Sequence, residues 1–245
     1  MLGALRELSL FAGGGGGLLG SGLLGHVPVC AVEHDPFCRS VLFARQRDRV
    51  LPPFPVWDDI ETFSGLLWRG KVDLVSAGFP CQGFSTASRG RRVQKNLWPE
   101  ALRVIQECAA PVVFAENVQR DPIQRAAADL ARIDYVVRCA RVPASSVGAP
   151  HRRERFWLLA YAHVWGEPAE PIDAEVAGLP AAGGAGPASH WWTDAPDQVL
   201  EVADGLPGGL ERSERDRAAR LSVLGNAQVP AAVVYAWKFL SRAHP

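Results

Sequence analysis

The sequence predicts an α/β fold in which helices cover both faces of an open, mostly parallel sheet, the doubly wound arrangement. Apolar segments typical of buried strands alternate with segments whose apolar residues recur at helical spacing. Five consecutive glycines, residues 13–17, separate the first apolar segment from the first helical one, and the second apolar segment ends in an acid, Glu33. Parallel strands need crossover connections, so this alternation favours a parallel sheet.

The expected elements follow from these patterns in chain order. The expected strands are apolar runs bounded by glycine, proline or polar residues, namely residues 5–11, 27–32, 72–77, 111–115, 135–142 and 155–160. The expected helices are residues 18–24, 36–46, 96–109, 122–133 and 231–240. In the fourth helix the residues expected to face inward are Ile123, Ala127, Leu130 and Ala131, and Trp98 of the third is expected in the core.

Composition limits the class of protein. Hydrophobic residues make up 48% of the chain, enough for a substantial core. The net charge of zero excludes a coat of basic charge but leaves room for a local basic cleft. The five cysteines include no Cys-x-x-Cys pair, so we expect no metal site, and the odd count indicates reduced thiols in a cytoplasm. The first ten residues lack a basic stretch before an apolar run, and no membrane association is expected.

The glycine run indicates a nucleotide-binding turn. Between a strand and a helix, backbone amides and the helix N-terminus can approach a ligand closely. An acid after the next strand, Glu33, can bind both hydroxyls of a ribose. The alternatives are a flexible glycine linker and an ordinary surface carboxylate. The turn alone would also suit a dinucleotide oxidoreductase, which predicts tight NAD binding.

A second candidate site follows the expected strand 72–77. Cys81 lies there on a turn stiffened by Pro80, at the strand end where open α/β sheets place their ligands. The small and polar residues that follow do not continue into a core. Cys81 is therefore a candidate nucleophile, and the alternative is a small buried thiol.

Five short motifs resemble those of the DNA (cytosine-5) methyltransferases and occur in that family's order. They are Leu10-Phe11-Ala12-Gly13, Phe79-Pro80-Cys81-Gln82, Glu116-Asn117-Val118, His151-Arg152-Arg153-Glu154-Arg155 and Gly225-Asn226-Ala227-Gln228-Val229-Pro230. The resemblance covers about residues 5–160 and 220–240. Each motif is weak alone, but five in order and at roughly the family's spacing are specific.

The resemblance implies the Rossmann-like sheet of the S-adenosylmethionine-dependent methyltransferases and three parts of the chain. Residues 1–162 would be the catalytic and cofactor-binding domain, and residues 163–215, rich in proline, glycine and alanine, a small irregular target-recognition lobe. Residues 216–245 would return to the first domain. The implied reaction is transfer of a methyl group from S-adenosyl-L-methionine to C5 of a cytosine flipped out of duplex DNA.

The resemblance also implies catalytic roles. Cys81 would add to C6 of cytosine, which makes C5 nucleophilic enough to accept a methyl group. Glu116 would hold or protonate N3, which predicts a buried carboxyl group with a raised pKa. Arg153 and Arg155, two apart on a strand and so on one face, would position the base and this carboxyl group. Arg153 would also favour the thiolate of Cys81. Two further residues, Pro80 and Asn117, would shape the catalytic loop.

Residues around the glycine turn and the sheet edge are expected to hold the cofactor. They are Phe11, Ala12, Gly13, Gly15, Glu33, His34, Asp59, Ile60, Pro80, Leu97, Asn226 and Ala227. His34 stands where the family often has an aromatic residue, and Ser9 where it often has Asp. Asp58 is an alternative to Asp59, and both could instead cap the next helix.

The segment 82–95 is expected to close over the DNA. The residues expected to contact DNA are Gln82, Ser85, Arg89, Arg91, Arg92, Lys95 and His151, the last in place of a Gln frequent in the family. Phosphate contacts predict an affinity that falls with salt. The expected partner is double-stranded DNA, a cognate restriction endonuclease is a candidate, and the protein is expected to be a monomer.

Two other interpretations stay open. An RNA cytosine-5 methyltransferase would share the fold, although Phe79 and the residues after Gln82 look more like those of the DNA enzymes. A catalytically degenerate DNA-binding module would suit the short lobe, but Cys81 and Glu116 are both present.

Overall fold

The structure, a computed structural model, describes residues 3–80, 95–149, 153–163, 220 and 223–242, together with the backbone of 173–175. Cys81, most of the expected recognition lobe and the tryptophans Trp165, Trp191 and Trp192 lie outside the described residues. In the described part of the chain no helix is long and apolar enough to cross a lipid bilayer.

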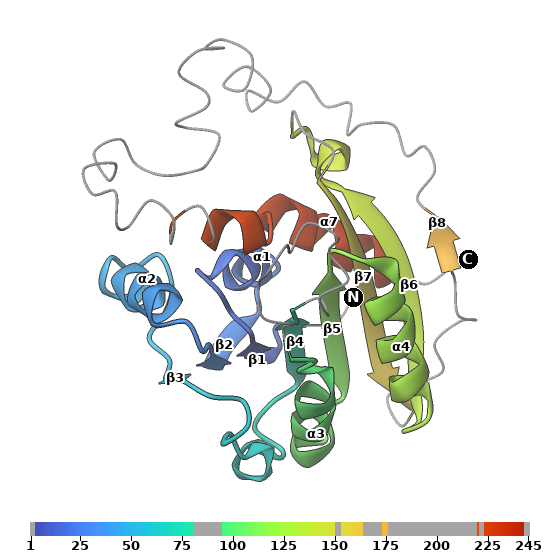
Figure 1. The fold of residues 1–245 in the computed structure, drawn as a ribbon, viewed down its shortest axis with the longest axis horizontal. Coiled ribbons are helices and arrows are strands. Elements are labelled where there is room, and N and C mark those ends of the chain that lie inside the picture. Colours follow the sequence, from blue (N-terminus) through green and yellow to red (C-terminus); the bar gives the residue numbers. More distant parts are fainter. Residues whose placement is uncertain are drawn as a thin grey trace.

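An eight-stranded open sheet forms the centre of the molecule (Figure 1). The strands are β1 (Arg6–Leu10), β2 (Val27–Val32), β3 (Val56–Trp57), β4 (Leu74–Gly78), β5 (Val112–Asn117), β6 (Tyr135–Pro143), β7 (Glu154–Ala162) and β8 (Asp173–Glu175). Their order is β3-β2-β1-β4-β5-β7-β6-β8. Strands β1 to β5 are parallel, and β7 is antiparallel to both β5 and β6. The predicted mostly parallel, doubly wound sheet is confirmed.

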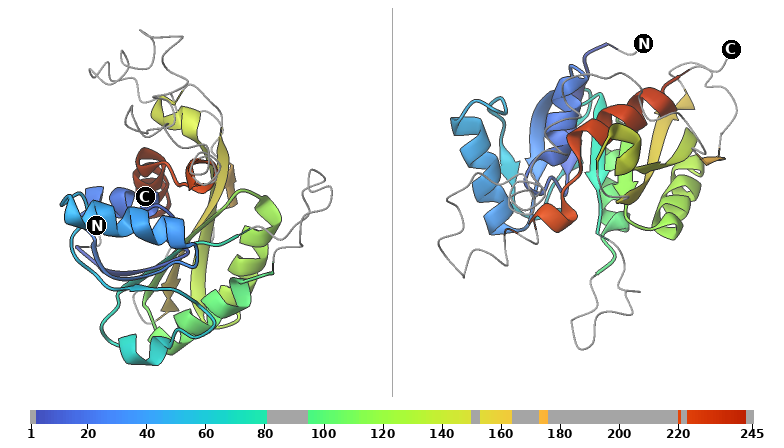
Figure 2. Two further views of the ribbon diagram at one scale, coloured as in Figure 1. Left: turned by 60° about the vertical axis from the view of Figure 1, so that its left-hand side comes forward. Right: turned by 90° about the horizontal axis from the view of Figure 1, so that it is seen from above.

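Helices cover both faces of this sheet (Figures 1 and 2). Helices α3 (Trp98–Cys108) and α4 (Arg120–Ala131) pack on one face. Helices α1 (Gly16–Leu23), α2 (Pro36–Arg47) and α7 (Pro230–Leu240) pack on the other. Two short 3-10 turns, η1 (Gly65–Trp68) and η2 (Ala144–Val147), follow β3 and β6.

Local sequence explains where α2 begins, whereas α4 differs from the expected helix in its start and in one inward residue. Helix α2 starts at Pro36 because the side chain of Asp35 accepts hydrogen bonds from the amides of Phe37 and Cys38. In α4 the buried residues are Ile123, Ala126 and Leu130. Ala131, which was expected to face inward, is exposed. The helix begins two residues before the expected start, at Arg120.

Strand alternation assigns each side chain of the sheet to one face. On β5, Val113 and Ala115 join the core under α3 and α4, whereas Phe114 joins the core under α7. Glu116 follows with the same parity as Phe114, so it lies on the α7 face. Trp98 is in the core as expected, with its ring 4.9 Å from that of Phe79.

Helix α7 packs across α1 and against β6 and β7. The ring of Trp237 meets Phe114 edge-on at 5.2 Å, and His26 at 4.6 Å. Arg138 on β6 donates to the carbonyl oxygens of Leu240 and Arg242, which satisfies the end of the helix. This docking fixes the direction of the chain just before α7.

Strand β8 lies within the range expected to form a separate lobe. Its backbone pairs in parallel with β6 between Cys139 and Arg141. The sheet therefore includes three residues beyond position 162.

Candidate active site

Three strand ends meet where the order of the sheet reverses between β1 and β4. In parallel register, Leu10 lies beside Ala77 and Gly78 beside Glu116. The glycine turn after β1, the Phe79-Pro80 segment after β4 and the Glu116-Asn117 pair on β5 thus share one edge. Ligands of doubly wound sheets bind at such a switch point. Cys81 follows Pro80 directly in the sequence, outside the described residues.

The glycine turn is held in a conformation that other residues adopt poorly. Gly13 and Gly15 have φ angles of +54° and +85°, and Gly15 is the N-cap of α1. A Cβ atom on Gly16 or Gly17 would lie 2.3 Å from the backbone oxygen or the side-chain Oε1 of Gln228, respectively. The long glycine run therefore serves two purposes. It allows the left-handed turn, and it leaves room for the segment before α7 to pack closely against α1.

Glu33 closes the turn against the end of β2. Its buried carboxylate, 8% exposed, accepts from the amide of Gly13 at 2.6 Å and from that of Asp35 at 2.7 Å. A Cβ atom on Gly13 would meet nothing within 4 Å, so the turn has open space beside this carboxylate. An acid at this strand end next to open space fits the ribose of a nucleoside cofactor.

The next candidate residues lie just after β2 and in the turn after β3. His34 approaches the carbonyl oxygen of Asp58 with Nδ1 at 3.2 Å. Asp59 accepts from the amide of Glu61 with Oδ1 at 2.9 Å, so this carboxylate organises its own turn. Ile60 is buried, 4% exposed.

Arg103 of α3 holds this turn in place, a role that the sequence did not reveal. Its guanidinium donates to the carbonyl oxygens of Ile60 at 2.7 Å and Phe63 at 3.0 Å. Glu100 and Glu107 on the same helix fix the guanidinium through ion pairs of 2.9 Å each. Helix α3 thereby supports the expected adenine side of the cofactor site.

Two apolar candidates flank the same region. Phe11 and Leu97 are partly buried against the core that contains Phe79. Phe11 has a φ angle of +56°, which is uncommon for a residue with a side chain. Such strain at a strand end is often found at ligand sites.

Glu116 is a buried acid between a cation and an amide. Its side chain approaches Arg155 Nε with Oε1 at 2.9 Å and accepts from Gln228 Nε2 with Oε2 at 3.1 Å. Oε1 makes no hydrogen bond among the described residues, so its contact with Arg155 is an ion pair in which the N–H group does not point at the oxygen. Burial raises the pKa of Glu116, against opposing effects of Gln228, Arg155 and Arg153. The raised pKa expected from the sequence is found.

Arg153 does not lie on the strand with Arg155, contrary to the expectation. Strand β7 begins at Glu154, and Arg153 has a φ angle of +32°. Its guanidinium donates to three carbonyl oxygens of the segment before α7, those of Leu224 at 3.1 Å, Gly225 at 2.7 Å and Ala227 at 2.7 Å. A left-handed backbone turn replaces the strand because the side chain reaches across to this segment. Both arginines still act electrostatically on Glu116.

Asn117 joins the ends of β4 and β5. Its buried Nδ2 donates to the carbonyl oxygen of Phe79 at 2.9 Å, and its Oδ1 accepts from the amide of Gln119 at 3.0 Å. The residue therefore fixes the backbone just before Pro80, which is partly buried.

The remaining candidates are distributed as follows. Asn226 is exposed and Ala227 is partly buried in the turn before α7. Lys95, an expected DNA contact, forms an exposed ion pair with Glu61 at 2.7 Å. The other expected DNA contacts lie outside the described residues, namely Gln82, Ser85, Arg89, Arg91, Arg92 and His151. In the described ranges, no three side chains suited to metal binding come together.

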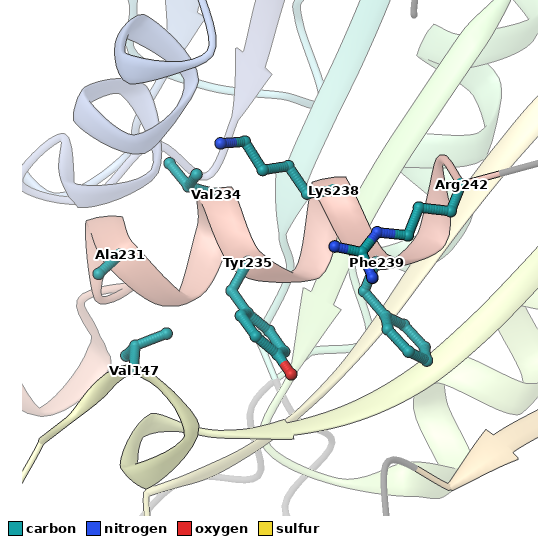
Figure 3. Close-up of a pocket in the computed structure, with 7 residues that line it drawn as sticks. All are labelled: Val147, Ala231, Val234, Tyr235, Lys238, Phe239 and Arg242. Atoms are coloured by element: carbon teal, nitrogen blue, oxygen red, sulfur yellow. The ribbon is translucent and has the colours of Figure 1, made fainter. Parts of the chain in front are cut away.

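Two cavities are lined by other residues than Glu33 and Glu116. One of about 320 Å³ lies along α7 and is lined by residues that include Tyr235, Lys238 and Arg242 (Figure 3). Another of about 540 Å³ lies at the start of α4, with Arg120, Arg125 and Phe156 in its wall. Neither is lined by Glu33 or Glu116, so the strand ends define the candidate site better than these cavities.

A buried acid and a glycine turn at the switch point of this sheet are features of the doubly wound folds that bind nucleotide cofactors. The model of the family described as C-5 cytosine-specific DNA methylase matches residues 5–172, and the chain belongs to this family. The family resemblance seen in the sequence is thereby confirmed.

Individual relatives agree with this assignment. The chain is 30% identical over 170 residues to the type II methyltransferase M.CviJI of Paramecium bursaria Chlorella virus IL3A, covering 64% of this chain and 43% of the relative. It is 36% identical over 119 residues to M.PspPI of Psychrobacter sp., covering 46% and 27%. The chain thus matches less than half the length of these relatives.

Solved structures share the fold. DNMT2 of Spodoptera frugiperda superposes with a TM-score of 0.57 at 19% identity, covering 71% of this chain and 55% of that one. Dnmt2 of S. pombe gives a TM-score of 0.53 at 18% identity, covering 70% and 51%.

Proposed function

We propose that the protein is a DNA methyltransferase that transfers a methyl group from S-adenosyl-L-methionine to C5 of a cytosine flipped out of duplex DNA. One observation carries most of the weight. Oε1 of Glu116 is buried at the switch point, lies 2.9 Å from Arg155 Nε and makes no hydrogen bond within the described part of the chain. A carboxyl oxygen of this kind, on a group with a raised pKa, suits a proton donor to the ring nitrogen of a base.

The chemistry divides between Cys81 and Glu116. The Cys81 thiolate adds to C6 of cytosine, and the negative charge that develops on the ring is offset by a proton at N3 from Glu116. C5 then takes the methyl group, with S-adenosyl-L-homocysteine as the leaving group. A base removes the C5 proton, the C6–sulfur bond breaks to release Cys81, and the proton at N3 returns to Glu116. Asn117 supports this scheme because it holds the Phe79 carbonyl two residues before Cys81.

The proposed cofactor fits the residues at the strand ends. Glu33 would bind the ribose hydroxyls, the turn at 12–15 would embrace the methionine moiety, and Ile60 with Phe11 and Leu97 would contact the adenine side. When bound, S-adenosyl-L-methionine supplies the methyl group. No metal is part of this proposal.

Arg155 and the segment 82–95 complete the proposal. Arg155 keeps Glu116 oriented at 2.9 Å, and the basic residues of the segment would bind phosphates on both sides of the flipped base. Double-stranded DNA is the proposed partner, the protein is proposed to act as a monomer, and a restriction endonuclease of matching specificity is a candidate partner in the cell.

Bisulfite sequencing of plasmid DNA from cells that express the protein tests this function, with Cys81→Ser expressed alongside. Protected cytosines in one short sequence context, absent with the variant, are expected. Methylation of tRNA without any protection of DNA would replace the proposal with the RNA-modifying alternative.

A further inference from the structure

Gln228 lies in the turn before α7, yet its side chain reaches the acid of β5, 112 positions away in sequence. Its Nε2 donates to Oε2 of Glu116 at 3.1 Å. Arg155 approaches the other oxygen, Oε1, without making a hydrogen bond to it. Among the described residues, Gln228 contacts one oxygen of this carboxyl group and Arg155 the other, and only Gln228 makes a hydrogen bond to it.

Three glycines, two on α1 and one on β4, leave the space that Gln228 occupies; this space is called its seat below. A Cβ atom on Gly17 would lie 2.3 Å from its Oε1, one on Gly16 2.3 Å from its backbone oxygen, and one on Gly78 3.1 Å from its Nε2. Side chains larger than hydrogen at these positions would collide with or crowd the amide or the backbone that carries it. The glycines let the turn pass close enough for the amide to reach Glu116.

The same seat fixes the orientation of the amide. Its oxygen lies at the first turn of α1, where free backbone N–H groups and the positive end of the helix favour an oxygen atom. Its NH₂ group then faces Glu116. On the opposite side, Arg153 holds the turn through the carbonyl oxygen of Ala227 at 2.7 Å. The backbone of Gln228 thus follows an anchored residue, and its side chain acts toward Glu116 as a donor.

We propose that Gln228 is a positioning residue for Glu116: by donating to Oε2 it holds the carboxyl group in one orientation toward the substrate base and favours its ionised form over its protonated form. The identity of that base rests on the proposed function, whereas the link between Gln228 and Glu116 does not. The sequence reveals Gln228 only as a member of the Gly225 to Pro230 motif, without a role.

The proposal predicts a change in the titration of Glu116 when the donor is removed. A hydrogen bond to the ionised carboxylate stabilises it more than any bond to the neutral acid. Within the described residues, the charged groups that act on Glu116 are Arg155 and Arg153, both on the β7 side, while its neighbours in register are Gly78 on β4 and Trp157 on β7. Loss of the Gln228 donor should therefore raise the pKa of Glu116 by about one unit.

Gln228→Met keeps the length of the side chain and removes the donor. The titration of Glu116 is followed by carbon-13 NMR of protein labelled at the Glu side-chain carboxyl groups, with Glu116→Gln identifying the signal. Gln46→Met is the matched control, because Gln46 donates to the carbonyl oxygen of Phe54 away from the strand ends. A rise with Gln228→Met and no change with Gln46→Met are expected. An unchanged Glu116 titration in a folded Gln228→Met protein overturns the proposal.

A second variant changes Gly17, the residue of α1 against which the side-chain amide of Gln228 packs. Gly17→Ala should push the amide away and raise the pKa of Glu116 in the same direction. In a Gln228→Ala background, which gives the new methyl group room, the same change should have no further effect. A further rise of similar size in that background would mean that Gly17 acts independently of Gln228, and would overturn the proposal.

The rate of methylation against pH gives the functional readout. If protonated Glu116 is the active form, the alkaline limb of kcat should move upward by about one pH unit with Gln228→Met. A kcat reduced equally at all pH values would indicate a merely structural role and contradict the proposal. A shifted titration in a wild-type protein that methylates no DNA would overturn the proposed function and leave the link between Gln228 and Glu116 standing.

Discussion

Asn117 on β5 donates to the carbonyl oxygen of Phe79, the residue after β4, at 2.9 Å. This bond joins two neighbouring strand ends at the point where the catalytic loop begins. The backbone amide of Gln119 donates to Oδ1 of Asn117 and so fixes the orientation of the Asn117 side chain. The backbone that leads into Pro80 and Cys81 is thus determined by a residue on the next strand.

Replacing Asn117 with Leu, which has a similar size, should loosen the approach to Cys81 without touching the cofactor. The Phe79 carbonyl would lose its partner, and a poorly positioned nucleophile commonly costs about 10²-fold in rate. We expect kcat to fall by about that factor while calorimetry shows near-normal S-adenosyl-L-methionine binding. A rate within a factor of two of wild type would show that Asn117 does not position the loop.

Arg155→Met should leave Glu116 buried beside fewer positive charges. Removing one partner of a buried pair costs about 3 kcal/mol, less if the remaining acid takes up a proton. Because the pKa of Glu116 is already raised in the folded protein, the variant should lose stability increasingly as the pH rises. Urea unfolding at pH 6 and pH 8 measures this loss, with Arg132→Met, an exposed helix arginine, as the control. An equal loss at both pH values would contradict the electrostatic explanation.

The burial of Glu7 predicts that the free energy of unfolding depends on pH, independently of catalysis. It is fully buried on β1, Ser76 donates to one of its oxygens, and burial raises its pKa to about 7. The folded protein therefore binds a proton here that the unfolded chain releases near pH 4.5. Stability should fall as the pH rises between these two values, by about 3 kcal/mol in total, and stay level above the folded pKa.

Glu7→Gln removes this titration. The variant should gain stability relative to the wild type between pH 5 and pH 8, as measured by urea unfolding. Glu61→Gln, which changes an exposed carboxylate paired with Lys95, should show no such gain. If wild type and Glu7→Gln have parallel stability profiles, Glu7 does not carry the proton.

Arg103→Met should weaken cofactor binding from a distance. The turn that contains Asp59 and Ile60 would lose the two carbonyl contacts of 2.7 and 3.0 Å to the guanidinium. The loss of two hydrogen bonds of about 1 kcal/mol each from a preformed site should raise the Kd for S-adenosyl-L-methionine by up to about 30-fold. Calorimetry measures the Kd, again with Arg132→Met as the control. An unchanged Kd would remove this turn from the cofactor site.

The fold was predicted well from the sequence because most strands and helices are determined by residues that are close together in the chain. The apolar runs and the glycine turn each act within a few residues, and β2 begins and ends where expected. Arg153 was placed wrongly on a strand because its backbone is set by carbonyl groups more than 70 positions away. For the same reason no local signal revealed Gln228 or Arg103, whose partners lie on distant segments.

The most direct test of the account is the covalent bond between Cys81 and C6 of cytosine. In duplex DNA synthesised with 5-fluorocytosine in place of cytosine, C5 carries fluorine where the base would remove a proton. The elimination is therefore blocked, and the adduct persists after methyl transfer. Incubation with the protein and S-adenosyl-L-methionine should give a protein–DNA complex that withstands denaturation. Peptide mass spectrometry should locate the attached nucleotide on Cys81. Cys81→Ser should give none. Methylation of ordinary DNA without any such adduct, or with an adduct at another residue, would contradict the account.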